Sequence, residues 1–124
     1  MLFRSFWITL EEGVEFVLGC LKMMRGGEIF IPKIPSIRIV DLTKAISPSC
    51  KLKIIGIRPG EKLHETLLSS DDGIHSYEFK DRFIVYPKVV SQNNKKRNGR
   101  YLGVEFKGYR SDNNNHWLNV EQLR

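Results

Sequence analysis

The stretch Lys53-Ile54-Ile55-Gly56-Ile57-Arg58-Pro59-Gly60-Glu61-Lys62 is the most distinctive part of this 124-residue chain. β-Branched residues dominate its first half, which predicts a strand from Lys51 to Ile57. Pro59-Gly60 then predicts a tight turn. The strand is therefore expected to end at a turn that carries Arg58 before it and Glu61 after it.

The residue types in this turn suit a nucleotide diphosphate. The Arg58 guanidinium can donate two parallel hydrogen bonds to phosphate oxygens, and the Glu61 carboxylate can accept hydrogen bonds from sugar hydroxyls. The alternative is a solvated turn that binds nothing. The motif alone leaves both interpretations open.

The chain before this stretch begins with a helix signal. Thr9-Leu10-Glu11-Glu12 has the capping-box form, in which the Thr and Glu side chains each satisfy a free backbone donor. Apolar residues then recur at three- and four-residue steps, and Gly26-Gly27 ends the pattern. This predicts an amphipathic helix over residues 10–25, and we expect its apolar stripe to pack in the core.

Shorter elements are predicted around the central stretch from β-branched runs, prolines and caps. They are strands at Glu28–Ile31 (closed by Pro32) and Ser36–Val40, a short helix capped by Asp41 and running through Ile46, one or two helical turns over Lys62–Leu68, and a strand pair or one interrupted strand over Tyr77–Tyr86. The order of strand, helix and strand predicts an α/β fold.

The last third of the chain is more polar. Residues 91–100 contain almost no apolar side chain, which predicts an exposed loop. We expect residues 1–90 to form the main part of one domain, with residues 91–124 as a polar loop and C-terminal tail of the same domain. Asn119 could cap a last helical turn. The basic run from Lys95 to Arg100 could instead bind nucleic acid, although Tyr101 is its only stacking aromatic.

Composition narrows the class of protein further. The chain is 41% hydrophobic with a net charge of +6, which is typical of a soluble globular protein that attracts anions. Its apolar runs are far shorter than the roughly 20 residues that span a bilayer. We therefore expect no membrane segment, and we expect the chain to lie in the cytoplasm. Cys20 and Cys50 are expected to be free thiols. His75 and His116 lack ligand-spaced partners, so no metal site is expected.

Several separated stretches resemble one known family. They are Phe6-Trp7-Ile8-Thr9-Leu10-Glu11-Glu12-Gly13-Val14, Gly27-Glu28-Ile29-Phe30-Ile31-Pro32-Lys33-Ile34-Pro35-Ser36, residues 54–65, and the tail segment Tyr109-Arg110-Ser111-Asp112-Asn113-Asn114-Asn115-His116-Trp117-Leu118. In this order they are similar to the inverting UDP-N-acetylglucosamine 4,6-dehydratases, which are extended short-chain dehydrogenases. The likeness is strongest over residues 6–90.

This resemblance implies a fold and a function. The chain would be the C-terminal, substrate-binding part of an extended short-chain dehydrogenase that acts on a UDP-sugar in pseudaminic acid or surface polysaccharide biosynthesis. Family members bind NADP(H), which oxidises C4 of the sugar before water is lost across C5 and C6. By family pattern, Arg58 would bind the diphosphate and Glu61 the ribose.

The motifs of the family's catalytic half are absent from this sequence. No Gly-x-x-Gly-x-x-Gly turn for a dinucleotide is present, and none of Tyr77, Tyr86, Tyr101 and Tyr109 is followed four residues later by Lys. We therefore expect no catalytic residue and no cofactor in this chain, and a chain that is inactive alone. The Rossmann cofactor domain is expected to be missing.

The start of the chain also departs from the family pattern. A basic residue precedes Phe-Trp in the family, whereas here Ser5 takes that place and Arg4 lies one position earlier. Arg4 is thus a weaker substrate-binding candidate, and residues 1–5 are expected to be a new start produced by truncation or frameshift. The alternatives are a non-catalytic subunit that pairs with a separate Rossmann half, a homo-oligomer as in the full-length family, and, ranked lowest, a basic nucleic-acid-binding module.

Overall fold

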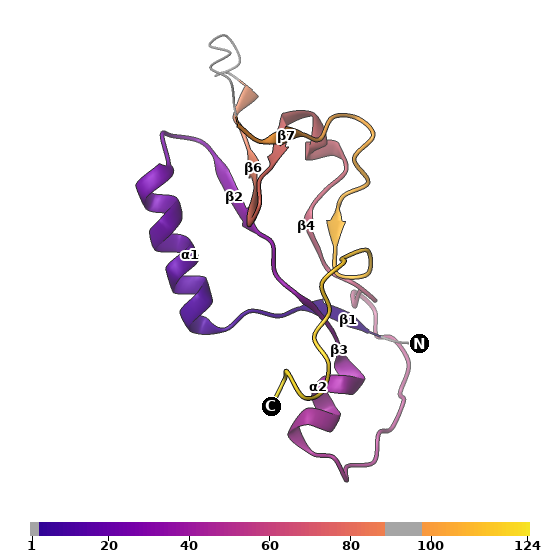
Figure 1. The fold of residues 1–124 in the computed structure, drawn as a ribbon. Coiled ribbons are helices and arrows are strands. Elements are labelled where there is room, and N and C mark those ends of the chain that lie inside the picture. The colour runs from indigo at the N-terminus through magenta and orange to yellow at the C-terminus, as the bar shows by residue number, and fades with distance from the viewer. Residues whose placement is uncertain (1–2, 89–97) are drawn as a thin grey trace. The chain divides into compact units, whose positions relative to one another are not determined.

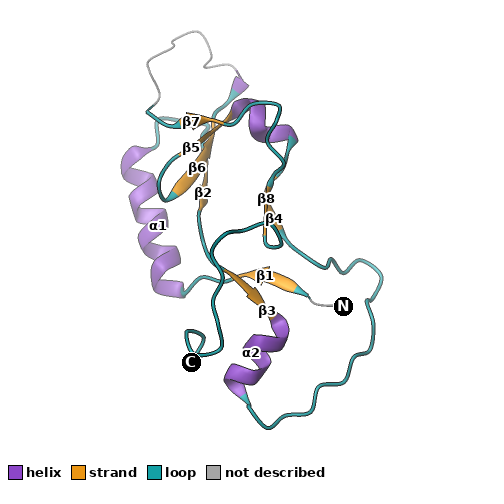
Figure 2. Cartoon of the chain, turned by 45° about the vertical axis from the view of Figure 1, so that its right-hand side comes forward, coloured by secondary structure: helices purple, strands orange, loops and turns teal. Residues whose placement is uncertain are grey.

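The computed structural model describes residues 3–88 and 98–124, and the chain forms two compact units (Figures 1 and 2). The motif unit comprises residues 1–7, 34–66 and 110–124. The sheet unit comprises residues 8–33 and 67–109. Each unit is thus assembled from segments that are far apart in the sequence.

The sheet unit is built on a four-stranded antiparallel sheet in the order β2-β6-β5-β7. Its strands are β2 (Ile29–Pro32), β6 (Arg82–Val85), β5 (Ser76–Glu78) and β7 (Arg100–Tyr101), and the 3₁₀ helix η1 (Asp71–His75) precedes β5. The predicted strand pair at residues 77–86 is confirmed as β5 and β6. The predicted strand at residues 28–31 is confirmed as β2.

Aromatic packing forms the core of the sheet unit. Phe83 on β6 is 5% exposed, and its ring centroid lies 5.0 Å from that of Tyr109 and 6.2 Å from that of Phe106. Ile31 and Ile84 are also buried. Because large aromatic rings bury much apolar area, these contacts are the main apolar stabilisation of this unit.

Helix α1 (Leu10–Met23) begins where the sequence predicts. Thr9 Oγ1 accepts from the Glu12 amide at 3.2 Å, and the Glu12 carboxylate accepts from the Thr9 amide at 2.9 Å. Gly27 has a positive φ of 79° after the helix. The capping box is therefore confirmed. The glycine stop is not, because the helix ends at Met23 with Met24 in an extended conformation, before Gly26 and Gly27.

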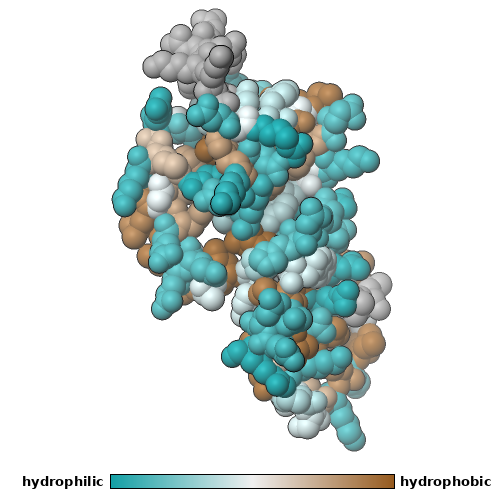
Figure 3. Space-filling view, viewed as in Figure 1, coloured by the Kyte–Doolittle hydropathy of each residue, from teal (hydrophilic) through white to brown (hydrophobic). Residues whose placement is uncertain are grey.

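The expectation that the apolar stripe of α1 is core is wrong. No residue of α1 is buried, and Leu10 is 84% exposed. Arg82 of β6 contacts the helix: its guanidinium lies 5.7 Å from the Phe16 ring centre and donates to Met23 Sδ at 3.4 Å. Hydrophobic side chains consequently reach the surface along α1 (Figure 3).

In the motif unit, β1 (Arg4–Phe6) and β3 (Ser36–Arg38) form an antiparallel pair, and α2 (Ile39–Ile46) follows β3 directly. The predicted strand at residues 36–40 is therefore shorter than expected. Ile37 is 1% exposed and is the apolar centre of the unit. Asp41 does not cap α2, because the helix already begins at Ile39 and Asp41 lies in its first turn.

Two predicted elements near the central stretch are wrong. Residues 51–57 form no strand, and among the described residues the structure gives them no hydrogen bond. Residues 62–68 form no helix; β4 (Thr66–Leu68) lies there instead. The Glu65 backbone bonds to Ser111 in both directions, so these groups do not bond to the next helical turn.

The C-terminal segment runs through β8 (Tyr109–Arg110) to a final turn. Asn119 caps this turn as predicted, because its Oδ1 accepts from the Gln122 amide at 2.9 Å. Of the basic run, residues 95–97 lie outside the described residues. Arg100 donates to the Glu78 carboxylate through Nε at 2.7 Å.

Candidate functional site

The sequence-predicted turn is present at residues 58–61. The Glu61 amide donates to the Arg58 carbonyl at 3.1 Å, and Gly60 between them has a φ of 86°. A positive φ after a proline is what a type II turn requires, and glycine adopts it without strain. The Pro-Gly pair thus fixes the backbone that carries both candidate side chains.

The two candidate side chains are used differently. Glu61 Oε2 accepts a hydrogen bond from the Arg58 amide at 2.8 Å, so this carboxylate closes the turn from the side-chain end. Among the described residues, none pairs with the Arg58 guanidinium. Arg58 is exposed. All five of its donors are therefore free to bind an anion.

A shallow hollow lies beside this turn. Its volume is about 420 Å³, and Phe3, Gly60, Glu61, Lys62 and Glu65 line it. It is open to solvent and its lining is mainly polar, so it is a surface depression rather than an enclosed pocket. The hollow combines one aromatic ring with a lysine and two carboxylates, a set that offers both stacking and polar contacts.

The third candidate, Arg4, lies on β1 next to the segment that follows the turn. Its amide donates to the Leu63 carbonyl at 2.9 Å. Its guanidinium has no ion pair within the described residues. The structure therefore brings the strand that carries Arg4 to the loop that carries Arg58 and Glu61.

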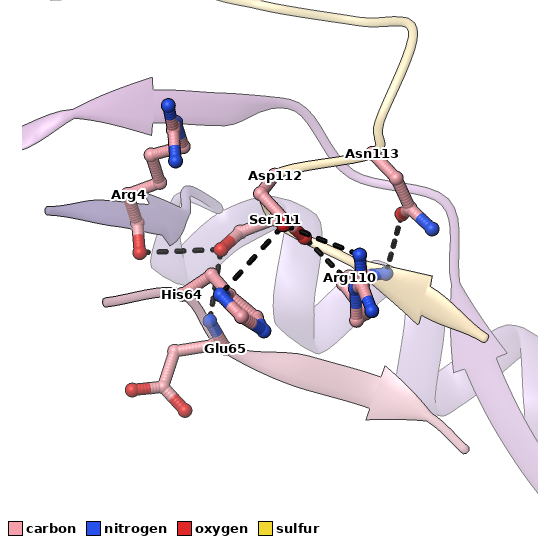
Figure 4. A network of polar contacts seen from close by, with 7 residues as sticks. All are labelled: Arg4, His64, Glu65, Arg110, Ser111, Asp112 and Asn113. Atoms are coloured by element: carbon pink, nitrogen blue, oxygen red, sulfur yellow. Dashed lines mark hydrogen bonds and ion pairs between the residues drawn. The ribbon is translucent and has the colours of Figure 1, made fainter. Parts of the chain in front are cut away.

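The C-terminal tail contacts the same loop (Figure 4). Ser111 is completely buried, and its hydroxyl accepts from the Glu65 amide at 2.9 Å and donates to the Arg4 carbonyl at 3.2 Å. Beside it, Arg110 Nε donates to Asp112 Oδ1 at 2.9 Å, and the Asp112 carboxylate lies 3.7 Å from His64 Nδ1. Sequence reasoning assigned no role to Ser111, Asp112 or His64.

Electrostatics around Asp112 favour its charged form. Partial burial opposes ionisation, but the hydrogen bond from Arg110 and the nearby His64 outweigh it and hold the pKa of Asp112 below its ordinary value of 3.8. Asp112 thus stays negative at neutral pH. The signal that could have revealed this group in the sequence is the run of four polar residues Arg110-Ser111-Asp112-Asn113 after Gly108-Tyr109.

A second hollow of about 330 Å³ lies in the sheet unit between α1 and β2. Its lining is mainly apolar, including Phe16, Leu21 and Phe30, with Cys20 at its wall. Burial raises the pKa of the Cys20 thiol, so this thiol is a weak nucleophile. Cys20 and Cys50 are both free.

The residues of this chain do not fit the NADP that the resemblance implies for full-length proteins. The two glycines of positive φ near a helix, Gly26 and Gly27, follow α1 rather than precede it, so they offer no helix N-terminus to a pyrophosphate. Within residues 3–88 and 98–124, no cluster of three metal-ligating side chains occurs. In that same part of the chain, no helix is long and apolar enough to cross a bilayer.

Comparison with known proteins places this chain in a family. The family model described as "Polysaccharide biosynthesis protein" matches residues 2–87. A UDP-N-acetylglucosamine 4,6-dehydratase (inverting) from Campylobacter jejuni is 46% identical over 95% of this chain, and the chain spans 37% of that relative. A UDP-glucose 4-epimerase from Rickettsia canadensis is 38% identical over 54% of the chain and 21% of its own length.

A solved structure agrees with these matches. Pen from Bacillus thuringiensis matches with a TM-score of 0.75 and 28% sequence identity, over 98% of this chain and 35% of that chain. The mixed helix and sheet fold is therefore that of a part of an extended short-chain dehydrogenase, as the sequence predicts. The chain belongs to the polysaccharide biosynthesis protein family. It spans 37% of the length of each of the two Campylobacter jejuni dehydratases that it matches.

Proposed function

We propose that this chain is the nucleotide-sugar-binding part of a UDP-N-acetylglucosamine 4,6-dehydratase. The observation that carries the proposal is the turn at residues 58–61, which carries an exposed Arg58 with no ion pair among the described residues, and whose Gly60 and Glu61 line an open hollow. The 46% identity to the Campylobacter jejuni dehydratase supports UDP-N-acetylglucosamine as the nucleotide sugar.

Each candidate residue has a stated role in this proposal. Arg58 donates a bidentate pair of hydrogen bonds to the diphosphate. Glu61 keeps the turn closed with Oε2, and its other carboxylate oxygen accepts a hydrogen bond from a ribose hydroxyl. Arg4, on the strand next to this loop, adds a second positive charge to the binding surface.

The wider activity of the family is part of the same proposal. The chain binds a UDP-sugar for surface polysaccharide or pseudaminic acid biosynthesis in the cytoplasm. It does not convert that sugar alone, because it carries neither a Tyr–Lys pair four residues apart nor a dinucleotide turn. Mixing the purified chain with UDP-N-acetylglucosamine and NADP is expected to leave the sugar unchanged, and formation of a 4-keto sugar would contradict this.

Calorimetric titration of the purified chain with UDP and with UDP-N-acetylglucosamine tests the binding role. Arg58→Ala is expected to lower the affinity for both ligands by about tenfold or more, because a charge-assisted pair of hydrogen bonds is lost. Arg25→Ala removes one exposed arginine of the sheet unit and is the matched control. Equal affinity of the wild type and Arg58→Ala would exclude the proposed role of Arg58.

A second candidate function rests on the exposed apolar residues. Ile54 is 83% exposed and Ile55 is 66% exposed, and they lie in a segment with no hydrogen-bond partner in the described residues. Exposed apolar area of this kind marks a surface that another polypeptide covers. We propose that a separately encoded Rossmann half, or a further copy of the chain, is that partner.

Co-expression tests this second candidate. The chain is expected to co-purify with a Rossmann-type polypeptide from the same family, and Ile54→Asp together with Ile55→Asp is expected to abolish the complex. Leu10→Asp changes an 84% exposed residue elsewhere and controls for a general effect of added charge. A chain that stays monomeric and well folded in the presence of such a polypeptide would refute the candidate.

A further inference from the structure

The C-terminal tail contacts the proposed nucleotide-binding loop through the buried Ser111 and through Asp112, whose carboxylate lies 3.7 Å from His64 Nδ1. Ser111 makes three hydrogen bonds: its amide donates to the Glu65 carbonyl at 2.9 Å, and its hydroxyl accepts from the Glu65 amide at 2.9 Å and donates to the Arg4 carbonyl at 3.2 Å. Its hydroxyl therefore joins segments 46 and 107 residues away in sequence.

The three segments close a ring of contacts. Arg4 donates through its amide to the Leu63 carbonyl at 2.9 Å, so β1 also bonds the loop directly. The loop is thus held from two sides, by β1 and by the tail (Figure 4). Residues 51–57 before the loop have no hydrogen bond in the described chain. The contacts with β1 and the tail, including that of Asp112 with His64, therefore hold the loop in place.

The C-terminal tail makes hydrogen bonds of its own on both sides of Ser111. The Arg110 amide donates to Asn113 Oδ1 at 2.9 Å, and the Arg110 guanidinium makes a two-pronged pair with Asp112. Further on, Asn114 Nδ2 donates to the Ile34 carbonyl at 2.8 Å and to Ser36 Oγ at 3.0 Å. Ser111 is therefore presented to the loop by a turn that is anchored on both sides.

We propose that Ser111 is a positioning residue for nucleotide binding, which acts by holding the loop from Arg58 to Glu65 against β1. This inference rests on the proposed function. A loop that is already ordered loses less conformational entropy when it binds a ligand. Ser111 thereby raises affinity for the nucleotide without touching it, and the family's tail becomes part of the binding site.

The first test measures order in the absence of ligand. Hydrogen exchange of the 124-residue chain is expected to show the Glu65 amide exchanging about tenfold faster in Ser111→Ala, since its acceptor is gone. Ser76→Ala is the matched control, because Ser76 is also fully buried and its hydroxyl donates to the Asp72 carbonyl at 2.6 Å in the sheet unit. It is expected to leave Glu65 exchange unchanged.

The second test measures UDP binding. Ser111→Ala is expected to lower the affinity for UDP by about tenfold, and Ser76→Ala is expected to leave that affinity unchanged. Ser111→Thr keeps the hydroxyl and is expected to restore most of the lost affinity. A structural defect alone would lower stability in both alanine variants without separating their affinities. Wild-type affinity and wild-type Glu65 exchange in Ser111→Ala would overturn the inference.

The outcomes separate this inference from the function on which it rests. If the wild type binds no UDP, the proposed function fails for this chain, and Glu65 exchange alone decides whether Ser111 holds the loop. If Ser111→Ala does not fold, Ser111→Cys replaces it, because a thiol is a weaker hydrogen-bond acceptor for the Glu65 amide than a hydroxyl is. Faster Glu65 exchange in Ser111→Cys supports the inference, and unchanged exchange overturns it.

Discussion

The two units of the chain are stabilised in different ways. The sheet unit has an aromatic core around Phe83 and a four-stranded sheet. The described residues of the motif unit include one deeply buried aliphatic side chain, Ile37, and many hydrogen bonds between distant segments. Apolar packing tolerates polar surface changes, but a network of directed bonds depends on single donors and acceptors. The candidate site lies in the unit that depends on single bonds.

The largest effect is expected from the core of the sheet unit. Phe83→Ala removes a ring that packs on Tyr109 and Phe106, so the free energy of unfolding should fall by about 3–4 kcal/mol. Urea unfolding followed by fluorescence measures it. Val104→Ala, at an 80% exposed position of the same unit, should change it by less than about 0.5 kcal/mol. Similar losses in both variants would contradict the aromatic core.

A hydrogen-bond variant probes the motif unit. Asn114→Ala removes the donor to the Ile34 carbonyl and to the buried Ser36 hydroxyl, and should cost about 2 kcal/mol in unfolding free energy. The neighbouring Asn115 is exposed and has no hydrogen bond in the described structure. Asn115→Ala is therefore the control in the same urea titration. Equal free energies of unfolding for Asn114→Ala and Asn115→Ala would contradict the proposed contrast between the two units.

Removal of the N-cap of α1 is expected to have a smaller effect on stability. Thr9→Ala removes the acceptor of the Glu12 amide, and loss of an N-cap costs about 1 kcal/mol. Because α1 buries none of its residues, this loss should appear as reduced helix signal in circular dichroism before the sheet unfolds. Thr9→Ser keeps the cap and should retain the helix. Equal helix signal in both variants would show that packing, not capping, holds α1.

The smallest expected effect is on the pH dependence of the chain's stability. Burial opposes ionisation of Glu78, but hydrogen bonds from Lys33 and Arg100 hold its pKa below the ordinary value of 4.5. A depressed folded pKa stabilises the chain above about pH 4.5, and this contribution is lost as pH falls through the folded pKa. Glu78→Gln should remove about 1 kcal/mol or less of that pH dependence. Identical unfolding curves of both proteins between pH 6 and pH 3 would contradict this.

Elements with local signals were predictable from the sequence. The capping box at Thr9, the turn at Pro59-Gly60 and the strand pair before Tyr86 depend on neighbours within a few residues. Residues 51–57 were predicted as a strand from their β-branched composition, yet a strand needs a partner, and the described chain supplies none. β-Propensity describes fit to a sheet surface rather than an intrinsic preference.

The candidate site was predictable only in part. Its turn and the side chains of Arg58 and Glu61 follow from ten consecutive residues, whereas the contact of Ser111 with Glu65 joins positions 46 residues apart. That contact also explains why residues 62–68 are not helical, since the tail takes the Glu65 backbone groups. Such a bond leaves no periodic pattern in the sequence.

The most direct test of the central claim asks whether Arg58 recognises the diphosphate itself. The purified wild-type chain and Arg58→Ala are each titrated with UDP and with uridine in a calorimeter. We expect the wild type to prefer UDP by at least about tenfold, and Arg58→Ala to lose most of that preference while its uridine affinity stays the same. A preference for UDP that persists unchanged in Arg58→Ala would contradict the account.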